Sequence, residues 1–223
     1  MPLAVIVTFC GIIVLAAYDN LHNGASGLSV HHEVAHELLA LLEFGLTPVA
    51  GFGAASIVTG DPARELHMTL MTPYPATISL RGLALLLWSS LIAVLAAVII
   101  RLAGYWIVVQ SAPLNQLLWL APMVGMAGLG AALALLLRNR SAAIAVLGVV
   151  WFGSFFLRPQ LIQDSHFRYI YLFLTFDTVQ GGLAYNAGFW LANRLILIGL
   201  GLALALVAVL LLRRNETLLG SEQ

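Results

Sequence analysis

The apolar positions of this chain fall in long runs that are separated by short polar connections. A helix needs about 20 mostly apolar residues to cross the hydrocarbon core of a bilayer. Six runs approach or reach that length, and the pattern therefore predicts six spanning helices: Pro2–Tyr18, Leu38–Thr59, Ile78–Leu102, Gln116–Leu137, Ser141–Leu157 and Phe189–Leu212. We interpret the first run as a span rather than a signal peptide, because it lacks a basic leading region and a small-x-small cleavage site.

The composition supports an integral membrane protein. Of the 223 residues, 61% are hydrophobic and only 9% are charged, whereas soluble domains carry roughly 25% charged residues. We therefore expect one all-α transmembrane domain covering residues 1–223. The ten basic residues are all arginine and are balanced by ten acids. No basic stripe is present, so nucleic acid is not an expected partner.

The arginines are shared unequally between the two sets of connections. If the N-terminus is cytoplasmic, the inner side holds Arg64, Arg81, Arg138, Arg140, Arg213 and Arg214. The outer side then holds Arg101, Arg158, Arg168 and Arg194. Basic residues concentrate in cytoplasmic connections. We therefore expect both termini to be cytoplasmic, with the longer connections, Asp19–Glu37 and Arg158–Gly188, on the outer side.

The connection Gly60–Thr77 has the signals of a short cytoplasmic helix. Asp61 is a favourable cap for a helix whose first residue is Pro62. Thr72 and Tyr74 each precede a proline, and residues before proline avoid the helical region. The predicted helix, Pro62–Met71, is too polar to span the membrane.

One face of this predicted helix is apolar. Leu66 and Leu70 lie on that face, whereas Arg64 and His67 lie largely off it. Isolated helices shorter than about 12–15 residues are marginal in water, so we expect this one to pack on a surface. That surface is either the membrane and the protein's own bundle, or a soluble partner.

The segment DPARELHMTLMTPYPATISLRGLALLL resembles the region after the second span of type-2 ABC exporter permeases. There, a cytoplasmic coupling helix reads acid-x-x-x-E-L…L-x-T-P and is followed by a basic residue and the third span. The matching residues here are Asp61, Glu65, Leu66, Leu70, Thr72, Pro73 and Arg81. The segment Tyr185–Leu219 is similar to the family's last helix, with Asn193–Arg194 near its outer end. Unlike the family, this sequence shows no basic amphipathic helix before its first span.

The resemblance implies a multi-pass permease of the bacterial plasma membrane. It would pair with a second copy or a related permease, and with separate ATPase subunits that bind ATP and Mg. No cofactor is expected on this chain, which has no G-x-x-x-x-G-K-[ST] phosphate loop. ATP binding would move the coupling helix, rock the spans and open a cavity at the subunit interface. The residues implied to contact the ATPase are Asp61, Pro62, Arg64, Glu65, Leu66, Leu70, Met71, Thr72 and Pro73.

The stretch His32–His36 reads HEVAH, the pattern of zinc metalloproteases. On a helix, His32 and His36 share a face, and Glu33 could activate a metal-bound water. A catalytic zinc needs a third protein ligand, for which the candidates are Asp164, His166 and Asp177 in the outer segment. A membrane-embedded zinc protease is the alternative function, with adventitious or regulatory zinc binding as a weaker form. A non-transporting scaffold subunit is the third hypothesis.

The same polar stretch could instead be a wet outer mouth at the start of the second span. Plain solvation at the membrane interface explains these residues equally well. Glu43 is more informative, because a carboxylate inside an apolar run marks either a pathway or a buried pair. Its predicted partner is Arg101 or Arg194. The candidate path or outer-gate residues are Glu43, His36, Asp164, His166 and Arg194.

Three further patterns concern packing. Gly and Ala recur at four-residue spacing in Val49–Ser56 and Gly125–Ala134, which predicts close helix contacts within the bundle or at a dimer seam. Pro48 and Pro122 are predicted kinks whose freed carbonyls are satisfied by Thr47 or by neighbouring helices. The outer segment between the fifth and sixth spans is aromatic, and we expect short re-entrant or interfacial helices there. The family resemblance implies that they act as an outer gate, and a static cap is the alternative.

Overall fold

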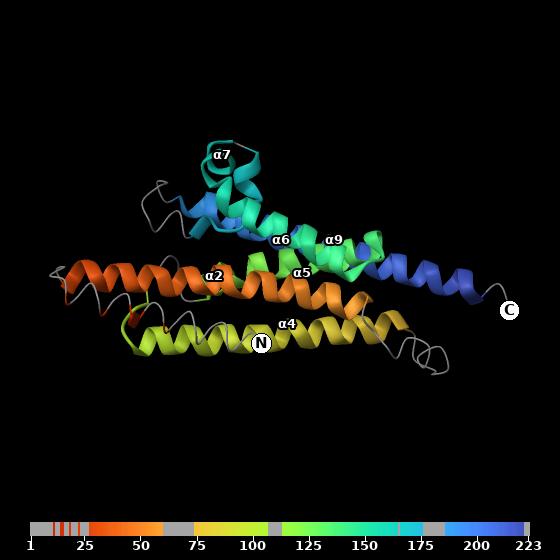
Figure 1. Ribbon diagram of the computed structural model, residues 1–223, viewed down its shortest axis with the longest axis horizontal. Coiled ribbons are helices and arrows are strands. Elements are labelled where there is room, and N and C mark those ends of the chain that lie inside the picture. Colours follow the sequence, from red (N-terminus) through yellow and green to blue (C-terminus); the bar gives the residue numbers. More distant parts are fainter. Residues whose placement is uncertain are drawn as a thin grey trace.

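The computed structural model describes residues 11, 14–15, 18, 22, 27–59, 74–106, 113–164, 166–175 and 186–220 (Figure 1). Every regular element in these ranges is helical, so the predicted all-α fold is confirmed for this part of the chain. The elements are α2 (Gly27–Thr59), α4 (Tyr74–Leu102), η1 (Leu114–Gln116), α5 (Leu117–Leu137), α6 (Arg140–Phe156), α7 (Arg158–Gln163), η2 (Phe167–Tyr169) and α9 (Ala187–Gly220).

Four described helices have the length and composition of membrane spans. These are Val34–Thr59, Tyr74–Leu102, Leu114–Leu137 and Ala187–Arg214, which correspond to the second, third, fourth and sixth predicted spans. Helix α6 matches the fifth predicted span but has only 17 residues. The first predicted span, apart from a few isolated positions, and the predicted coupling helix Pro62–Met71 lie outside the described residues.

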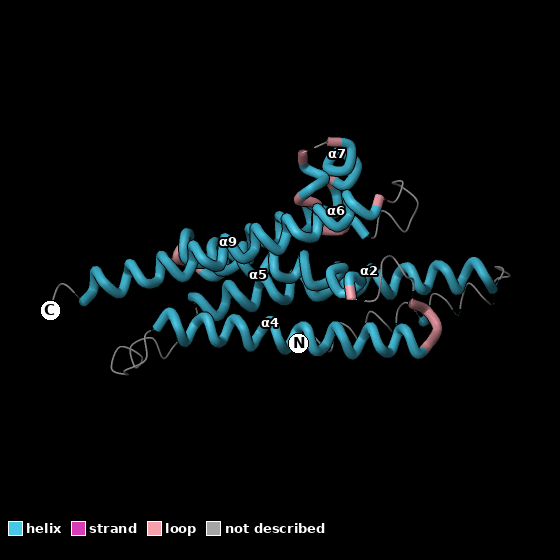
Figure 2. The backbone as a smooth tube through the Cα atoms, turned by 180° about the vertical axis from the view of Figure 1, so that it is seen from behind, coloured by secondary structure: helices cyan, strands magenta, loops and turns pink. Residues whose placement is uncertain are grey.

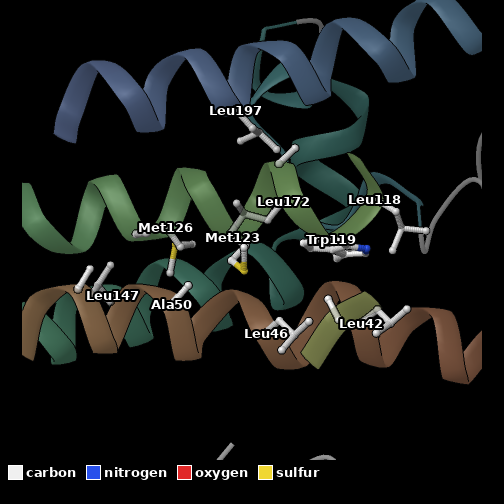
Figure 3. Close-up of a cluster of buried hydrophobic side chains, with 14 of the residues drawn as sticks. Leu42, Leu46, Ala50, Leu118, Trp119, Met123, Met126, Leu147, Leu172 and Leu197 are labelled. Carbon is white, nitrogen blue, oxygen red and sulfur yellow. The ribbon is translucent and has the colours of Figure 1, made fainter. Parts of the chain in front are cut away.

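Helix α5 lies at the centre of the bundle, between α2 on one side and α9 on the other (Figure 3). Helix α4 runs antiparallel to α2 and packs mainly against it, and α6 packs against both α2 and α5 (Figures 1 and 2). The side chains that fill the layer between α2 and α5 include Leu46, Ala50, Met123 and Met126, all at most 2% exposed. Leu172, from the segment between α7 and α9, points into the same core (Figure 3).

Small residues allow α5 to approach both neighbours at backbone distance. A Cβ built on Gly130 would collide with the carbonyl of Gly51 in α2, and a Cβ on Gly128 would collide with the carbonyl of Gly201 in α9. No side chain larger than hydrogen fits at these crossings without moving a backbone. The small-residue pattern is therefore used for packing within the bundle, one of the two predicted uses.

Arginines from separate parts of the chain lie at one end of the bundle. The last residue of α2, the start of α4, the α5–α6 turn and the end of α9 lie at the same end (Figure 1). At the α5–α6 turn, Arg138 adopts a left-handed backbone with φ of 51°. The side chain of Asn139 then caps α6 by accepting the N–H of Ala142 at 3.1 Å. Arg138, Arg140, Arg213 and Arg214 therefore gather at one end of the molecule, as the predicted topology requires.

The described part of the segment between α6 and α9, residues 157–164 and 166–175, folds back onto the bundle. Its short helices α7 and η2 agree with the prediction of short elements here. Its aromatic rings are not all interfacial, however. Phe167 is 52% exposed, whereas Tyr171 is 2% and Phe173 0% exposed. The two buried rings pack into the protein because the backbone after η2 is held tightly against α9 by the contacts described next.

Candidate functional site

Glu43 and Arg194 form a buried ion pair that joins α2 to α9. A terminal nitrogen of the Arg194 guanidinium donates to Oε1 of Glu43. The two side chains are 1% and 0% exposed. The prediction that Glu43 pairs with Arg101 or Arg194 is resolved in favour of Arg194. Two opposite charges in direct contact can be tolerated in a place where either charge alone would be very costly.

Thr175 is the third member of the cluster. Its backbone N–H donates to Oε1 of Glu43 at 3.3 Å, and its hydroxyl oxygen accepts from Arg194 at 2.6 Å. The indole N–H of Trp190 donates to the same hydroxyl oxygen at 3.0 Å. The Arg194 guanidinium also lies 5.4 Å from the centre of the Trp190 ring, within the range of a cation–π contact. The ion pair is thus connected to the segment that precedes α9.

Asn193 fastens that segment to α9. Its side-chain amide lies within donor distance of three backbone carbonyls, those of Arg168, Tyr169 and Tyr171, at 2.9 to 3.1 Å. Arg194 adds a bond to the carbonyl of Leu172 at 3.2 Å. A non-helical backbone inside a membrane protein must have its polar groups satisfied by protein. Two consecutive residues of α9 thus lie within donor distance of four carbonyls of residues 168–172, and the two N–H groups of the Asn193 amide are shared among three of them.

Pro48 explains a second link, between α2 and α6. Proline has no N–H, so the carbonyl of Phe44, four residues earlier, loses its helical partner. The indole N–H of Trp151 in α6 donates to that carbonyl at 3.2 Å. The hydroxyl of Thr47 donates to the carbonyl of Glu43. The freed carbonyl of Phe44 is therefore satisfied by a neighbouring helix, one of the two predicted ways, whereas Thr47 bonds a different carbonyl.

A cluster of three aromatic rings, Phe44, Trp151 and Phe173, connects α2, α6 and the segment before α9. The ring of Phe44 stacks on Phe173 with centroids 3.9 Å apart and an interplanar angle of 17°. Trp151 meets both rings edge to face, at 6.4 and 6.3 Å. Such pairs contribute about 0.5–1.5 kcal/mol each beyond their burial. Helices α2 and α6 and the segment before α9 are thus packed together at this level of the bundle.

An apolar groove lies between α2 and α6, beside this cluster. Its volume is about 640 Å³. Gly45 and Pro48 leave space along α2, and aromatic side chains line both walls: Phe44, Phe52, Trp151, Phe152, Phe155 and Phe156. Glu37, at one end, is the charged residue of the lining. The groove is suited to an elongated apolar or amphipathic molecule.

The other predicted site residues are not brought into the ion-pair cluster. His36 is only 7% exposed, which argues against both alternatives for this residue, the wet outer mouth and plain solvation. Its turn of α2 is covered, with the adjacent Val34 packed against Tyr105, just after α4. The acid closest to His36 among the described ion pairs is its neighbour Glu37, with Nδ1 and Oε1 4.0 Å apart.

Asp164 and His166 lie on the exposed turn between α7 and η2. Oδ1 of Asp164 accepts from the N–H of His166 at 2.7 Å and of Phe167 at 3.2 Å. These two bonds, in that order of effect, lower the pKa of Asp164 below its usual value of 3.8. Here the carboxylate shapes the turn.

The HEVAH stretch lies wholly within α2, since this helix begins at Gly27 and not at Leu38. The side chains of His32 and Glu33 are outside the described set. Among the side chains that are described, no three His, Cys, Asp or Glu residues are grouped closely enough to hold a metal ion.

Comparison with known proteins gives no relative for this chain. No protein-family model, no curated protein and no solved structure matches it.

Sequence reasoning gave no role to three members of the cluster. Thr175 and Trp190 carry no sequence signal of their own, because their role depends on how the segment before α9 folds back. Asn193 was notable only through the family resemblance. Glu43 was found because it is an isolated carboxylate in an apolar run.

Proposed function

We propose that this chain is the permease subunit of an ATP-driven ABC exporter. The observation that supports it most is the continuity of α2. This helix runs without interruption from the buried cluster at Glu43 to Thr59, directly before the predicted coupling helix Pro62–Met71. One continuous helix, in which the bond from Trp151 to the carbonyl of Phe44 replaces the one lost at Pro48, thus connects the predicted ATPase contact with the segment over the other end of the bundle.

The length of that element makes it a suitable lever. Glu43 and Thr59 are 16 positions apart, about 24 Å along a helix, which is most of the hydrocarbon thickness of a bilayer. A displacement of the coupling helix would be passed along α2 to the ion pair with Arg194. Because this pair and Thr175 are linked, the segment before α9 would move with α2 rather than independently of it.

In this proposal, the groove between α2 and α6 forms one half of the translocation path. Its walls are apolar and aromatic, and they belong to the lever α2 and to α6, a shorter helix linked to it at Trp151. Rocking of α2 relative to α6 would change the width of the groove. In a complex of two permeases, two such grooves would complete the cavity at the subunit interface. The lining supports a cargo with a large apolar part.

In this proposal, Glu43 and Arg194 are positioning residues. Both are essentially without solvent exposure, and their described bonds go to each other, to Thr175 and to the carbonyl of Leu172. A cargo contact would need the pair to open. The proposal therefore assigns Phe44 and Trp151 to the path and assigns the ion pair to its support.

Copurification tests the proposal. The tagged chain is expected to retain a second chain that carries a G-x-x-x-x-G-K-[ST] phosphate loop and hydrolyses ATP. Leu66→Asp and Leu70→Asp should each release that chain, because they place a charge on the predicted docking face. His67→Asp is the matched control. It adds the same charge off that face and should leave the complex intact.

Two results would count against the proposal. One is a purified chain without any ATPase under conditions that preserve membrane complexes. The other is equal release by Leu66→Asp and His67→Asp, which would show that charge anywhere in this connection disrupts the protein. An ATPase that copurifies but drives no transport would instead favour the scaffold hypothesis.

A further inference from the structure

A second pocket lies between the end of α4 and the start of α5, away from the groove. Its volume is about 410 Å³. Val94, Ala97, Val98 and Arg101 form its α4 side. Trp106, Asn115 and Gln116 complete it from the turn after α4 and from η1. The proposed transport mechanism does not use this pocket.

The pocket lies at the depth of a lipid headgroup. Arg81 and Arg101 are 20 positions apart on α4, about 30 Å along the helix axis, which equals the usual hydrocarbon thickness. The two arginines therefore mark the two boundaries of the hydrocarbon layer on this helix. Trp106 beside Arg101 is also a residue type that favours the interface. Val94, Ala97 and Val98 lie one to two turns deeper, toward the acyl chains.

The turn after α4 fixes the shape of the pocket. Gly104 has φ of +83°, and its N–H donates to the carbonyl of Arg101 at 3.1 Å. The N–H of Tyr105 donates to Ile100 at 3.0 Å. This is a Schellman motif, which requires a left-handed residue and is satisfied best by glycine. Tyr105 then packs against Val34 of α2, and Trp106 is held at the pocket wall.

The described residues in the polar half of the pocket offer hydrogen-bond donors and include no acid. Arg101 was a predicted partner of Glu43, but Arg194 has that role, and Arg101 makes no ion pair within the described part of the chain. Arg101 is exposed. Oε1 of Gln116 accepts from the indole of Trp119 at 3.1 Å, which leaves the amide nitrogen of Gln116 as a donor. No Asp or Glu is among the described lining residues.

We propose that this pocket binds an anionic phospholipid. Its headgroup phosphate lies beside Arg101 and the Gln116 amide, and an acyl chain follows Val94 and Val98, which are 41% and 48% exposed. The absence of an acid from the described lining favours a net negative headgroup over a zwitterionic one, whose ammonium would lack a partner. The apolar half favours a lipid over a free phosphate, which would leave it unfilled. The proposal does not depend on the transport function.

Lipid retention by the purified protein tests this site. The full chain is equilibrated in mixed micelles with equal amounts of phosphatidylglycerol and phosphatidylethanolamine, and bound lipid is measured by native mass spectrometry. Phosphatidylglycerol should be retained preferentially. Arg101→Gln should reduce its retention about fivefold, the usual effect of one arginine near a charged headgroup. Arg140→Gln, an equal charge change at the other end of the bundle, should not.

A second variant tests the apolar half without changing charge. Val98→Trp should fill the space of the acyl chain and reduce retention of both lipids. Because Val98 is already exposed, this variant is expected to fold. Millimolar glycerol phosphate should not displace the lipid. Equal retention of the two lipids, equal effects of Arg101→Gln and Arg140→Gln, or displacement by glycerol phosphate would each overturn the proposal.

Discussion

At the scale of single residues, the buried carboxylate of Glu43 is the centre of the site, because Arg194 and the N–H of Thr175 both donate to it. An unpaired charge inside a membrane protein is very costly, so a carboxylate in the middle of an apolar run predicts a basic partner. The partner, Arg194, sits on the last span, 151 positions away. A sequence can indicate that such a pair exists, but the choice between Arg101 and Arg194 depends on the packing of α9 against α5.

Removing one member of this pair should destabilise the fold. Glu43→Leu leaves a buried, uncompensated Arg194, and loss of one partner in a buried pair typically costs about 3–5 kcal/mol. We expect the thermal midpoint of the purified chain in detergent to fall clearly. The double variant Glu43→Leu with Arg194→Leu should recover part of the loss, because no unpaired charge then remains. A single variant that unfolds like the native chain but loses transport would identify Glu43 as a cargo contact.

Asp164 gives a prediction about pH. Its pKa is lowered by the N–H groups of His166 and Phe167, so its charged form is favoured in the folded protein. The stabilisation is present above the unfolded pKa of 3.8 and is lost as the pH falls through the lower folded pKa. We therefore expect the amides of His166 and Phe167 to stay protected from hydrogen exchange at neutral pH. Asp164→Ala should abolish that protection at every pH, and unchanged protection would contradict the turn described here.

The HEVAH stretch gives a prediction about metal. Because His36 is buried and no described acid or histidine completes a three-ligand group around it, we expect the purified chain to hold far less than one zinc per molecule. Removal of metal by a chelator should leave the thermal midpoint unchanged. Zinc bound in a one-to-one ratio, with a peptidase activity that Glu33→Gln abolishes, would instead establish the protease hypothesis.

At the scale of elements, the crossings of α5 with α2 and α9 depend on glycine. Small residues at four-residue spacing predicted close packing, and their spacing alone could not say whether the partner was within the chain. The structure shows it to be Gly51 on one side and Gly201 on the other. The early start of α2 was missed for a related reason. Its first turns are polar, so the apolar run that defined the predicted span begins eleven residues later.

A single added methyl group at the crossing of α5 and α9 should force the two helices apart. A Cβ at Gly128 would meet the backbone of Gly201, which cannot move aside as a flexible side chain would. We expect Gly128→Ala to lower the unfolding midpoint in detergent. The free energy of unfolding should fall by about 1–3 kcal/mol, the usual effect of overpacking. Gly199→Ala is the control, since a Cβ at Gly199 has nothing within 4 Å. Equal midpoints for the two variants would contradict the crossing.

At the scale of the whole molecule, hydropathy predicted the class of fold well. Four predicted spans correspond to long apolar helices, because an unbroken run of apolar residues has few alternatives to a membrane helix. The way the segment before α9 folds back was not predictable. Its bonds run from side chains of α9 to backbone carbonyls, and backbone carbonyls carry no sequence signature. Of the transport hypothesis, the parts that rest on the coupling helix remain predictions.

The central claim is that nucleotide binding on a partner chain moves α2 relative to α6. Its most direct test is a distance between spin labels at Val49→Cys on α2 and Val149→Cys on α6, in a chain whose single cysteine, Cys10, is replaced by serine. The complex with its ATPase is measured in lipid vesicles with and without a non-hydrolysable ATP analogue. We predict that the analogue shifts the distance distribution by several ångströms and that Leu66→Asp removes the shift. The same distribution with and without nucleotide, in a complex that still hydrolyses ATP, would contradict the account.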